Sequence, residues 1–214
     1  AERLTAAQQR NIPTATAFLA AREQTLLAQL FPHDPPVFFG GCDGAERRVA
    51  AYLPDYLEES WLLGDDSPVA AVRAVYFEED TLTHRDFLGA LMGAGIKRET
   101  VGDIYVAPGR CDFVVLRELR DFFLQNLPSA GHTKLTLAPL DLAELSAPAA
   151  AVKTRHDTVS SLRFDSVLAS AFNLARGKAA AIIESGRAEL DHALCQKPDK
   201  PVSEGSILSV RGLG

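Results

Sequence analysis

The chain has 214 residues, enough for one medium-sized domain or for two or three small ones. Apolar residues make up 47% and charged residues 23%, which excludes a disordered polymer and is ordinary for a folded protein. The formal net charge of −6 excludes a uniformly basic nucleic-acid coat protein but leaves room for a local basic face.

Residues 1–67 are predicted to form a mostly helical N-terminal region. Apolar residues recur at three- and four-residue spacings, which predicts helix through residues 1–31, and an amphipathic pattern predicts a second helix over residues 45–53. Between them, the apolar run 37–39 leads into the glycine-rich stretch 40–44. We expect a tight turn there, because no Gly-Lys-Ser/Thr follows to make a phosphate-binding loop.

Residues 68–145 are predicted to form an α+β domain. The patterns follow one another in the order β-α-β-β-α-β, which is the split ferredoxin-like arrangement also used by RNA-recognition modules. Thr83 is expected to cap the first helix, with Asp86 as the acid three residues later. The expected strands are 69–77, 101–106, 112–116 and 134–137, and the expected helices are 83–93 and 117–127.

A third domain is predicted over residues 153–214, after an Ala/Pro-rich linker at 138–152. It contains two expected helices and two short extended segments. The helices are 165–173 and 176–185, and the extended segments are 188–190 and 207–210.

No reaction chemistry emerges from the residues. The three cysteines and five histidines never reach metal-ligand or disulfide spacing, so we expect no disulfide, no metal and no cofactor. The triplet His84-Arg85-Asp86 lacks the Asn that a kinase catalytic loop needs five residues later. No apolar run is long enough for a membrane helix. The sequence therefore predicts a protein that is neither an enzyme nor embedded in a membrane.

The basic residues near the C-terminus are the candidate binding site. Residues 1–149 sum to a charge of −8, whereas residues 150–214 sum to +2. If the two C-terminal helices form a hairpin, their cations and the N–H groups at the helix starts would converge on phosphate oxygens. A solvated set of cations is the alternative, and the hypothesis fails if these side chains splay apart or pair with carboxylates. The four candidates are Arg163, Arg176, Lys178 and Arg187; secondary candidates are Arg47, Arg48, Lys97, Arg98 and Arg211.

The C-terminal segment resembles the S4-like RNA-binding domain, which carries the αL motif. Four stretches match the motif in order: Ser161-Leu162-Arg163-Phe164-Asp165, Leu174-Ala175-Arg176-Gly177-Lys178, Ile182-Ile183-Glu184-Ser185-Gly186 and Val202-Ser203-Glu204-Gly205-Ser206-Ile207. The resemblance implies that Arg163 and Arg176 contact RNA phosphates, that Lys178 assists, and that Asp165 orients the helix start.

The sequence departs from the S4-like pattern in three places. Ala175 replaces a serine, Ala188-Glu189-Leu190-Asp191 replaces a Val-x-Val-Asn strand, and Ser206 replaces an acid. Asp191 is expected to add negative charge near the RNA face. The resemblance also implies a C-terminal domain that continues past the last residue given.

Further stretches resemble YlmH-type proteins. They are Phe38-Phe39-Gly40-Gly41, Ala45-Glu46-Arg47-Arg48, Thr83 to Leu91, Gly95 to Ile104 and Ser209-Val210-Arg211-Gly212. This resemblance implies a cytoplasmic, non-enzymatic protein, monomeric off the ribosome, that associates with the large ribosomal subunit. Its implied partners are rRNA and peptidyl-tRNA, and its implied role is quality control of stalled ribosomes. Two alternatives stay open: an RNA-modifying enzyme with an appended S4-like module, and a protein-interaction adaptor in cell division.

Overall fold

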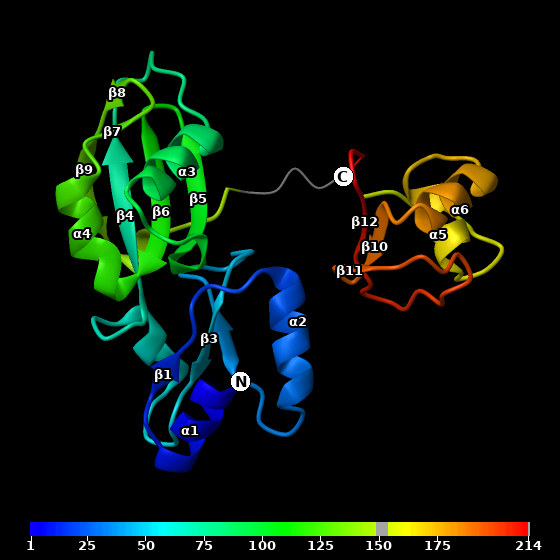
Figure 1. Cartoon of the computed structure of the whole chain (residues 1–214), viewed down its shortest axis with the longest axis horizontal. Coiled ribbons are helices and arrows are strands. Elements are labelled where there is room, and N and C mark those ends of the chain that lie inside the picture. The colour runs from blue at the N-terminus through cyan, green and yellow to red at the C-terminus, as the bar shows by residue number, and fades with distance from the viewer. Residues whose placement is uncertain (149–153, 214) are drawn as a thin grey trace. The chain divides into compact units, whose positions relative to one another are not determined.

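The computed structural model describes residues 1–148 and 154–213, which fall into two compact units, residues 1–149 and 150–214 (Figure 1). Both units combine helices with small sheets, which confirms the α+β class. The division lies within the predicted linker 138–152, of which residues 149–152 are outside the described residues.

The N-terminal part of the first unit combines two helices with a small sheet, so the mostly helical prediction is wrong in part. The sheet has the strand order β1-β3-β2, and all its pairs are antiparallel. The elements are α1 (Glu2–Arg10), β1 (Thr14–Ala15), α2 (Ala21–Leu30), β2 (Val37–Phe39) and β3 (Val49–Tyr52).

Two helices replace the single helix predicted over residues 1–31. Asn11 ends α1 in the left-handed conformation, with φ of 51°, and its N–H donates to the carbonyls of Ala7 and Gln8. Pro13 follows, and proline has no N–H with which to continue a helix. Phe18 then lies outside any helix, with 1% of its surface exposed.

Residues 49–52 form a strand where the sequence pattern predicts a helix. β3 lies at the centre of its sheet, where Ala51 pairs with Ala15 on one side and with Val37 on the other. A central strand gains hydrogen bonds from two neighbours. This pairing between distant segments overrides the local helix preference of an alanine-containing run.

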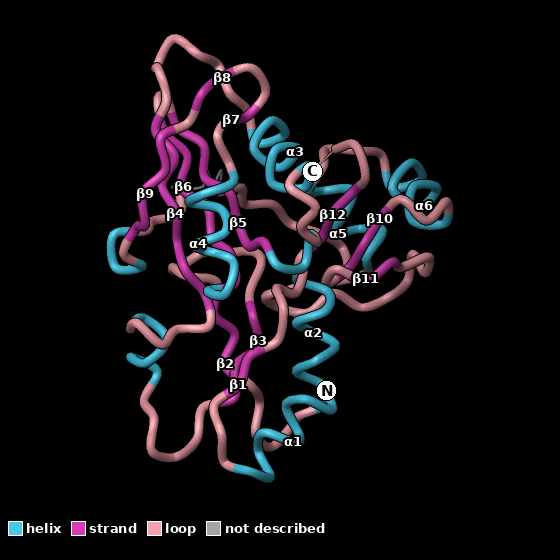
Figure 2. The backbone as a smooth tube through the Cα atoms, turned by 60° about the vertical axis from the view of Figure 1, so that its left-hand side comes forward, coloured by secondary structure: helices cyan, strands magenta, loops and turns pink. Residues whose placement is uncertain are grey.

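The central part of the first unit has the predicted β-α-β-β-α-β order. Its four-stranded antiparallel sheet has the order β5-β6-β4-β9, so β6 lies between β4 and β5 and splits the first β-α-β unit (Figure 2). The last strand is displaced from the predicted 134–137 to 136–140, and Pro139 is tolerated there because β9 is an edge strand. The elements are β4 (Val69–Val75), α3 (His84–Gly93), β5 (Val101–Ala107), β6 (Arg110–Leu116), α4 (Arg120–Asn126), β7 (Ser129–Ala130), β8 (Thr133–Lys134) and β9 (Thr136–Leu140).

Helices α3 and α4 both pack on one face of this sheet. Phe87 and Phe123, one from each helix, are fully buried there against Phe113 of β6. The predicted start of α3 is confirmed: the N–H of Thr83 donates to the Asp86 carboxylate at 2.8 Å, and the Asp86 N–H donates to the Thr83 carbonyl at 3.1 Å.

The other face of the sheet is partly covered by the N-terminal part. Phe18 and Val49 share a buried cluster with Val69 and Val114 of the sheet and with Leu142, which follows β9. The predicted boundary at residue 67 therefore does not separate two cores. Residues 138–145 of the predicted linker also belong to the folded first unit, because Leu140, Leu142 and Leu145 all join this cluster. The linker prediction is wrong for these residues.

The second unit is a helical hairpin with a three-stranded antiparallel sheet of order β11-β10-β12. Its core contains Phe164 and Leu168 of the first helix, Ile183 of the second and Val210 of the last strand. Both predicted helices and both predicted extended segments are confirmed. The elements are α5 (Phe164–Ala171), α6 (Arg176–Glu184), β10 (Ala188–Leu190), β11 (Ala193–Leu194) and β12 (Leu208–Val210).

Candidate nucleic-acid interface

The candidate site is built around Asp165, in the first turn of α5. Phe164, just before it, is fully buried, and only 5% of the Asp165 surface is exposed. The N–H groups of Phe164 and Asp165 donate to the carbonyls of Lys200 and Pro198 at 2.8 and 2.9 Å. The loop at residues 198–201 therefore fixes the start of α5, and the Asp165 side chain is buried there.

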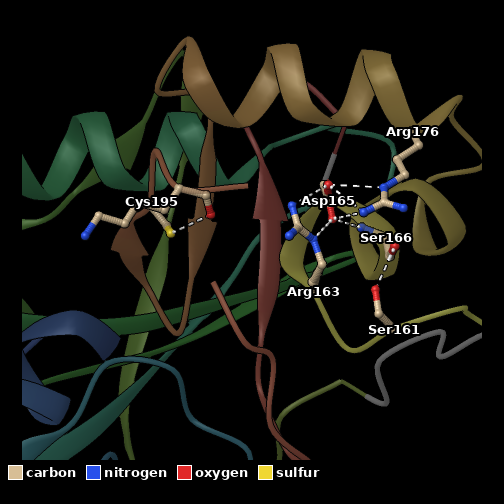
Figure 3. Close-up of polar contacts among 7 residues, drawn as sticks. Ser161, Arg163, Asp165, Ser166, Arg176 and Cys195 are labelled. Atoms are coloured by element: carbon tan, nitrogen blue, oxygen red, sulfur yellow. Dashed lines mark hydrogen bonds and ion pairs between the residues drawn. The ribbon is translucent and has the colours of Figure 1, made fainter. Parts of the chain in front are cut away.

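Two arginines from different segments bind this carboxylate. Arg163, just before α5, donates from Nε and Nη2 at 3.2 Å each, and Arg176, the first residue of α6, donates from Nε and Nη2 at 3.1 and 3.3 Å. They reach Asp165 from opposite sides (Figure 3). The structure therefore brings together two of the four predicted RNA-binding residues, but through a carboxylate.

Ion pairing sets the protonation of this cluster. Burial by itself raises the pKa of Asp165, but the hydrogen bonds and charges of Arg163 and Arg176 outweigh it and hold the pKa below its ordinary value. The hydrogen bond to Asp165 in turn raises the pKa of Arg163. At neutral pH, the cluster is therefore one carboxylate between two guanidinium groups, with a net charge of +1.

The two arginines were expected to be free to bind RNA phosphates, and their pairing with Asp165 corrects that expectation. The pairing nevertheless leaves some of their N–H donors available. A guanidinium group has five N–H donors, and each arginine commits two of its nitrogens to Asp165. The side chains of Arg163 and Arg176 remain 44% and 52% exposed. Each arginine can still donate N–H groups to a phosphate on the solvent side. Because of Asp165, the cluster offers that phosphate a net charge of +1, whereas two unpaired arginines would offer +2.

The helix starts differ from the expectation. At α5 the N–H groups are already taken: those of Phe164 and Asp165 by the loop, and that of Ser166 by the Asp165 carboxylate at 2.8 Å. At α6, the N–H groups of Arg176 and Gly177 have no acceptor within the described residues. Lys178 is exposed in the same first turn. Only α6 therefore offers helix-start N–H groups beside the arginine pair.

Arg187 does not converge with the other three cations. Three residues beyond the last residue of α6, it lies at the opposite end of that helix from Arg176. Nine helical residues at about 1.5 Å each put about 13 Å between the two ends. Arg187 instead lies beside Arg211, whose N–H donates to the Arg187 carbonyl at 2.9 Å. The prediction of one compact four-cation corner is therefore wrong.

Three of the secondary candidates are occupied within the fold. Arg47 donates to the carbonyls of Val101 and Phe18, and Arg98 donates to that of Val101. Burial, together with the nearby Arg47 charge, lowers the pKa of Arg98 against the opposing influence of Asp103. Arg48 donates to the Ala45 carbonyl at 2.7 Å, whereas Lys97 is exposed. Arg47 thereby joins the N-terminal part to the central sheet, whereas Arg48 and Arg98 each bind a carbonyl three residues away in their own part.

Asp191 has a structural role that the sequence analysis missed. Asp191 and His192 have φ of 53° and 61° in the turn between β10 and β11. The Asp191 carboxylate accepts hydrogen bonds from the Ile207 N–H at 2.9 Å and from the Ser206 hydroxyl at 3.3 Å. It therefore ties this turn to the loop before β12. The sequence held a signal for this contact. Ser206 stands where the S4-like pattern has an acid, and Asp191 stands where it has an asparagine, so a hydroxyl donor and a carboxylate acceptor are exchanged together.

On the sheet face opposite α3 and α4, Tyr105 of β5 pairs with Asp112 and is half-buried in the cluster shared with the N-terminal part. The outward positions of β4 and β6 hold Arg73 and Asp112, which form a two-pronged ion pair at 2.7 and 2.8 Å. RNA-recognition modules stack bases on aromatic rings at such positions. Within the described residues, the outward positions of β4 and β6 thus offer no aromatic ring for base stacking.

Metal and membrane sites were searched over the described ranges, 1–148 and 154–213. No three His, Cys, Asp or Glu side chains lie close enough to hold a metal ion, and Cys42, Cys111 and Cys195 are free thiols. None of the described helices is long and apolar enough to cross a bilayer.

Comparison with known proteins gives the family. Residues 74–144 match the family model described as "Putative RNA-binding domain in YlmH". The chain is 36% identical over 204 residues to the ribosome-associated protein quality control protein P2 of Bacillus subtilis (strain 168), a match that covers 93% of this chain and 77% of that protein. The chain belongs to the YlmH family. The resemblance predicted from the sequence is therefore confirmed at the level of the family.

A solved YlmH structure has a related fold. The cell division protein ylmH from Streptococcus pneumoniae matches with a TM-score of 0.54 at 18% identity, over 67% of this chain and 87% of that chain. At this identity the likeness concerns the fold alone. The S4-like character of the second unit stays a prediction, as do the roles of the individual site residues.

Proposed function

We propose that this YlmH-family chain is a non-catalytic RNA-binding protein that associates with the large ribosomal subunit. In this role it contacts rRNA and peptidyl-tRNA and acts in the rescue of stalled ribosomes. The proposal includes a cytoplasmic location and a monomeric state off the ribosome. It is supported by the match to a putative RNA-binding domain and by the name of the Bacillus subtilis relative.

The observation that carries the proposal is the pair Arg163 and Arg176 on Asp165. Guanidinium groups match phosphate in geometry, and a guanidinium already fixed on a carboxylate loses little rotamer freedom when it binds. Lys178 and the first N–H groups of α6 add donors on the same side of the hairpin start. With no aromatic ring among the described outward positions of β4 and β6, recognition would rest on RNA shape and phosphate positions.

The test is a titration of labelled rRNA and tRNA with the full chain at about 50 and 200 mM salt. Arg163→Ala and Arg176→Ala are tested singly, because each leaves the other arginine to neutralise Asp165. Each lost phosphate contact lowers the salt slope of log K by about 0.9. Arg85→Ala is the matched control, since Arg85 is exposed on α3 in the first unit. Slopes and affinities equal to the control for both variants would refute the proposed site.

A second candidate function, a protein-interaction adaptor in cell division, is favoured by the net charge of −8 on residues 1–149 and by the name of the Streptococcus pneumoniae relative. Capture of a division protein by the first unit, with RNA affinity absent at low salt, would support the adaptor instead.

A further inference from the structure

A second pair of arginines lies at the end of the C-terminal sheet. Arg187 precedes β10 and Arg211 follows β12, next to the paired residues Ala188 and Val210 (Figure 1). The Arg211 N–H donates to the Arg187 carbonyl at 2.9 Å, so the two residues continue the antiparallel ladder opposite each other. Side chains opposite each other on neighbouring strands start about 5 Å apart, and like charges there repel.

No carboxylate forms an ion pair with either arginine among the described residues. The one side-chain hydrogen bond of Arg187 within these residues goes from Nε to the Ser185 hydroxyl at 3.2 Å. Both are exposed and line an open hollow of about 550 Å³, together with Glu189, Leu194 and Ser209. The hollow thus holds two cations and one acid, and it differs from the first site, where the carboxylate is bound.

We propose that Arg187 and Arg211 hold a second phosphate of the bound RNA, so that the C-terminal unit is a two-point phosphate binder. This inference rests on the proposed function and makes it more specific. An anion between the two guanidinium groups relieves their repulsion and accepts hydrogen bonds from both. Phosphodiester fits better than a protein carboxylate because its several oxygens can serve two arginines at once.

The two sites must contact different phosphates. Arg176 begins α6 and Arg187 follows its end, so about 13 Å of helix separates them. The unit therefore selects an RNA whose backbone presents phosphates at this spacing, which is recognition by shape. Glu189 opposes the bound phosphate and limits the affinity of the second site.

The experiment measures the affinity of the full chain for labelled large-subunit rRNA and for tRNA over a salt series. In Arg187→Ala/Arg211→Ala the salt slope should fall by about 0.9, because the two arginines share one phosphate, and Arg187→Lys/Arg211→Lys should recover most of it. Glu189→Gln should tighten binding about two- to five-fold. Adding Arg176→Ala to the double alanine variant should lower the slope by about one more unit, because distant sites act additively. Far-UV circular dichroism checks that each variant is folded.

The outcomes separate this inference from the proposed function. If Arg176→Ala weakens binding while the double alanine variant matches Arg85→Ala, the second site is refuted and the first stands. A triple variant that binds as well as the double variant refutes the two-point arrangement. Loss of ribosome association without loss of RNA affinity assigns the pair to a protein partner and also refutes it. If the wild-type chain binds neither RNA, both proposals fail.

Discussion

Replacing Asp165 by asparagine tests whether the arginine pair depends on this carboxylate. The carboxylate accepts five hydrogen bonds, four from Arg163 and Arg176 and one from the Ser166 N–H. Asparagine keeps one acceptor oxygen, removes the charge and points an NH₂ donor at guanidinium groups. Asp165→Asn should therefore loosen both arginines and destabilise the start of α5.

The size of the effect follows from the exposure of the partners. Hydrogen bonds to charged groups contribute about 1.5–3 kcal/mol each when buried. The two arginines are 44% and 52% exposed, so water replaces much of what they lose. We therefore expect Asp165→Asn to lower the free energy of local unfolding of α5 by about 2 kcal/mol. This is close to the contribution of one such hydrogen bond, although four to the arginines are affected.

The assay is amide hydrogen exchange of α5 and α6 in the full chain, which reports the free energy of local unfolding. Glu204→Gln is the control, because Glu204 is exposed in the same unit and its side chain accepts no hydrogen bond within the described residues. Equal protection of α5 in the two variants at pH 7 would refute the structural role of Asp165.

The pH dependence gives a second check on the same variant. Because the arginines hold the folded-state pKa of Asp165 below its ordinary value, its contribution is present above the unfolded pKa of about 3.9. It is lost as the pH falls through the lowered folded-state pKa. The gap in protection between wild type and Asp165→Asn should therefore close with acidification, and a gap that persists well below the folded-state pKa contradicts ion pairing as its source.

Two further predictions concern the first unit. Cys111 is fully buried, and burial raises the pKa of its thiol. A thiol reagent at pH 8 should therefore modify Cys42 and Cys195 in the native chain, and Cys111 only after unfolding. Labelling of Cys111 in the native chain would contradict the packing of β6. Gly102→Ala would place a Cβ 2.7 Å from the Phe18 ring and should lower the free energy of unfolding in urea by about 1–3 kcal/mol. Gly89→Ala, with nothing within 4 Å of the added Cβ and an exposed position inside α3, should instead raise it by up to about 1 kcal/mol. Equal midpoints for the two variants would contradict the contact between Phe18 and β5.

Much of the fold was predictable from local pattern. The order of strands and helices in the central part, the cap of α3 and both C-terminal helices follow from periodicity and capping residues a few positions apart. The family was also accessible, because its motifs are short runs of adjacent residues. Even the edge position of β9 has a local signal in Pro139.

Only the tertiary structure decided which charges meet. Residues 49–52 became a strand because β1 and β2 pair with it from both sides, and a local pattern contains neither neighbour. Arg176 reaches Asp165 across the helical hairpin, eleven positions along the chain, while Arg187 is carried to the far end of α6 and beside Arg211. Spacing along a sequence determines the residues that share a helix or strand, but electrostatic contacts between elements depend on how those elements pack.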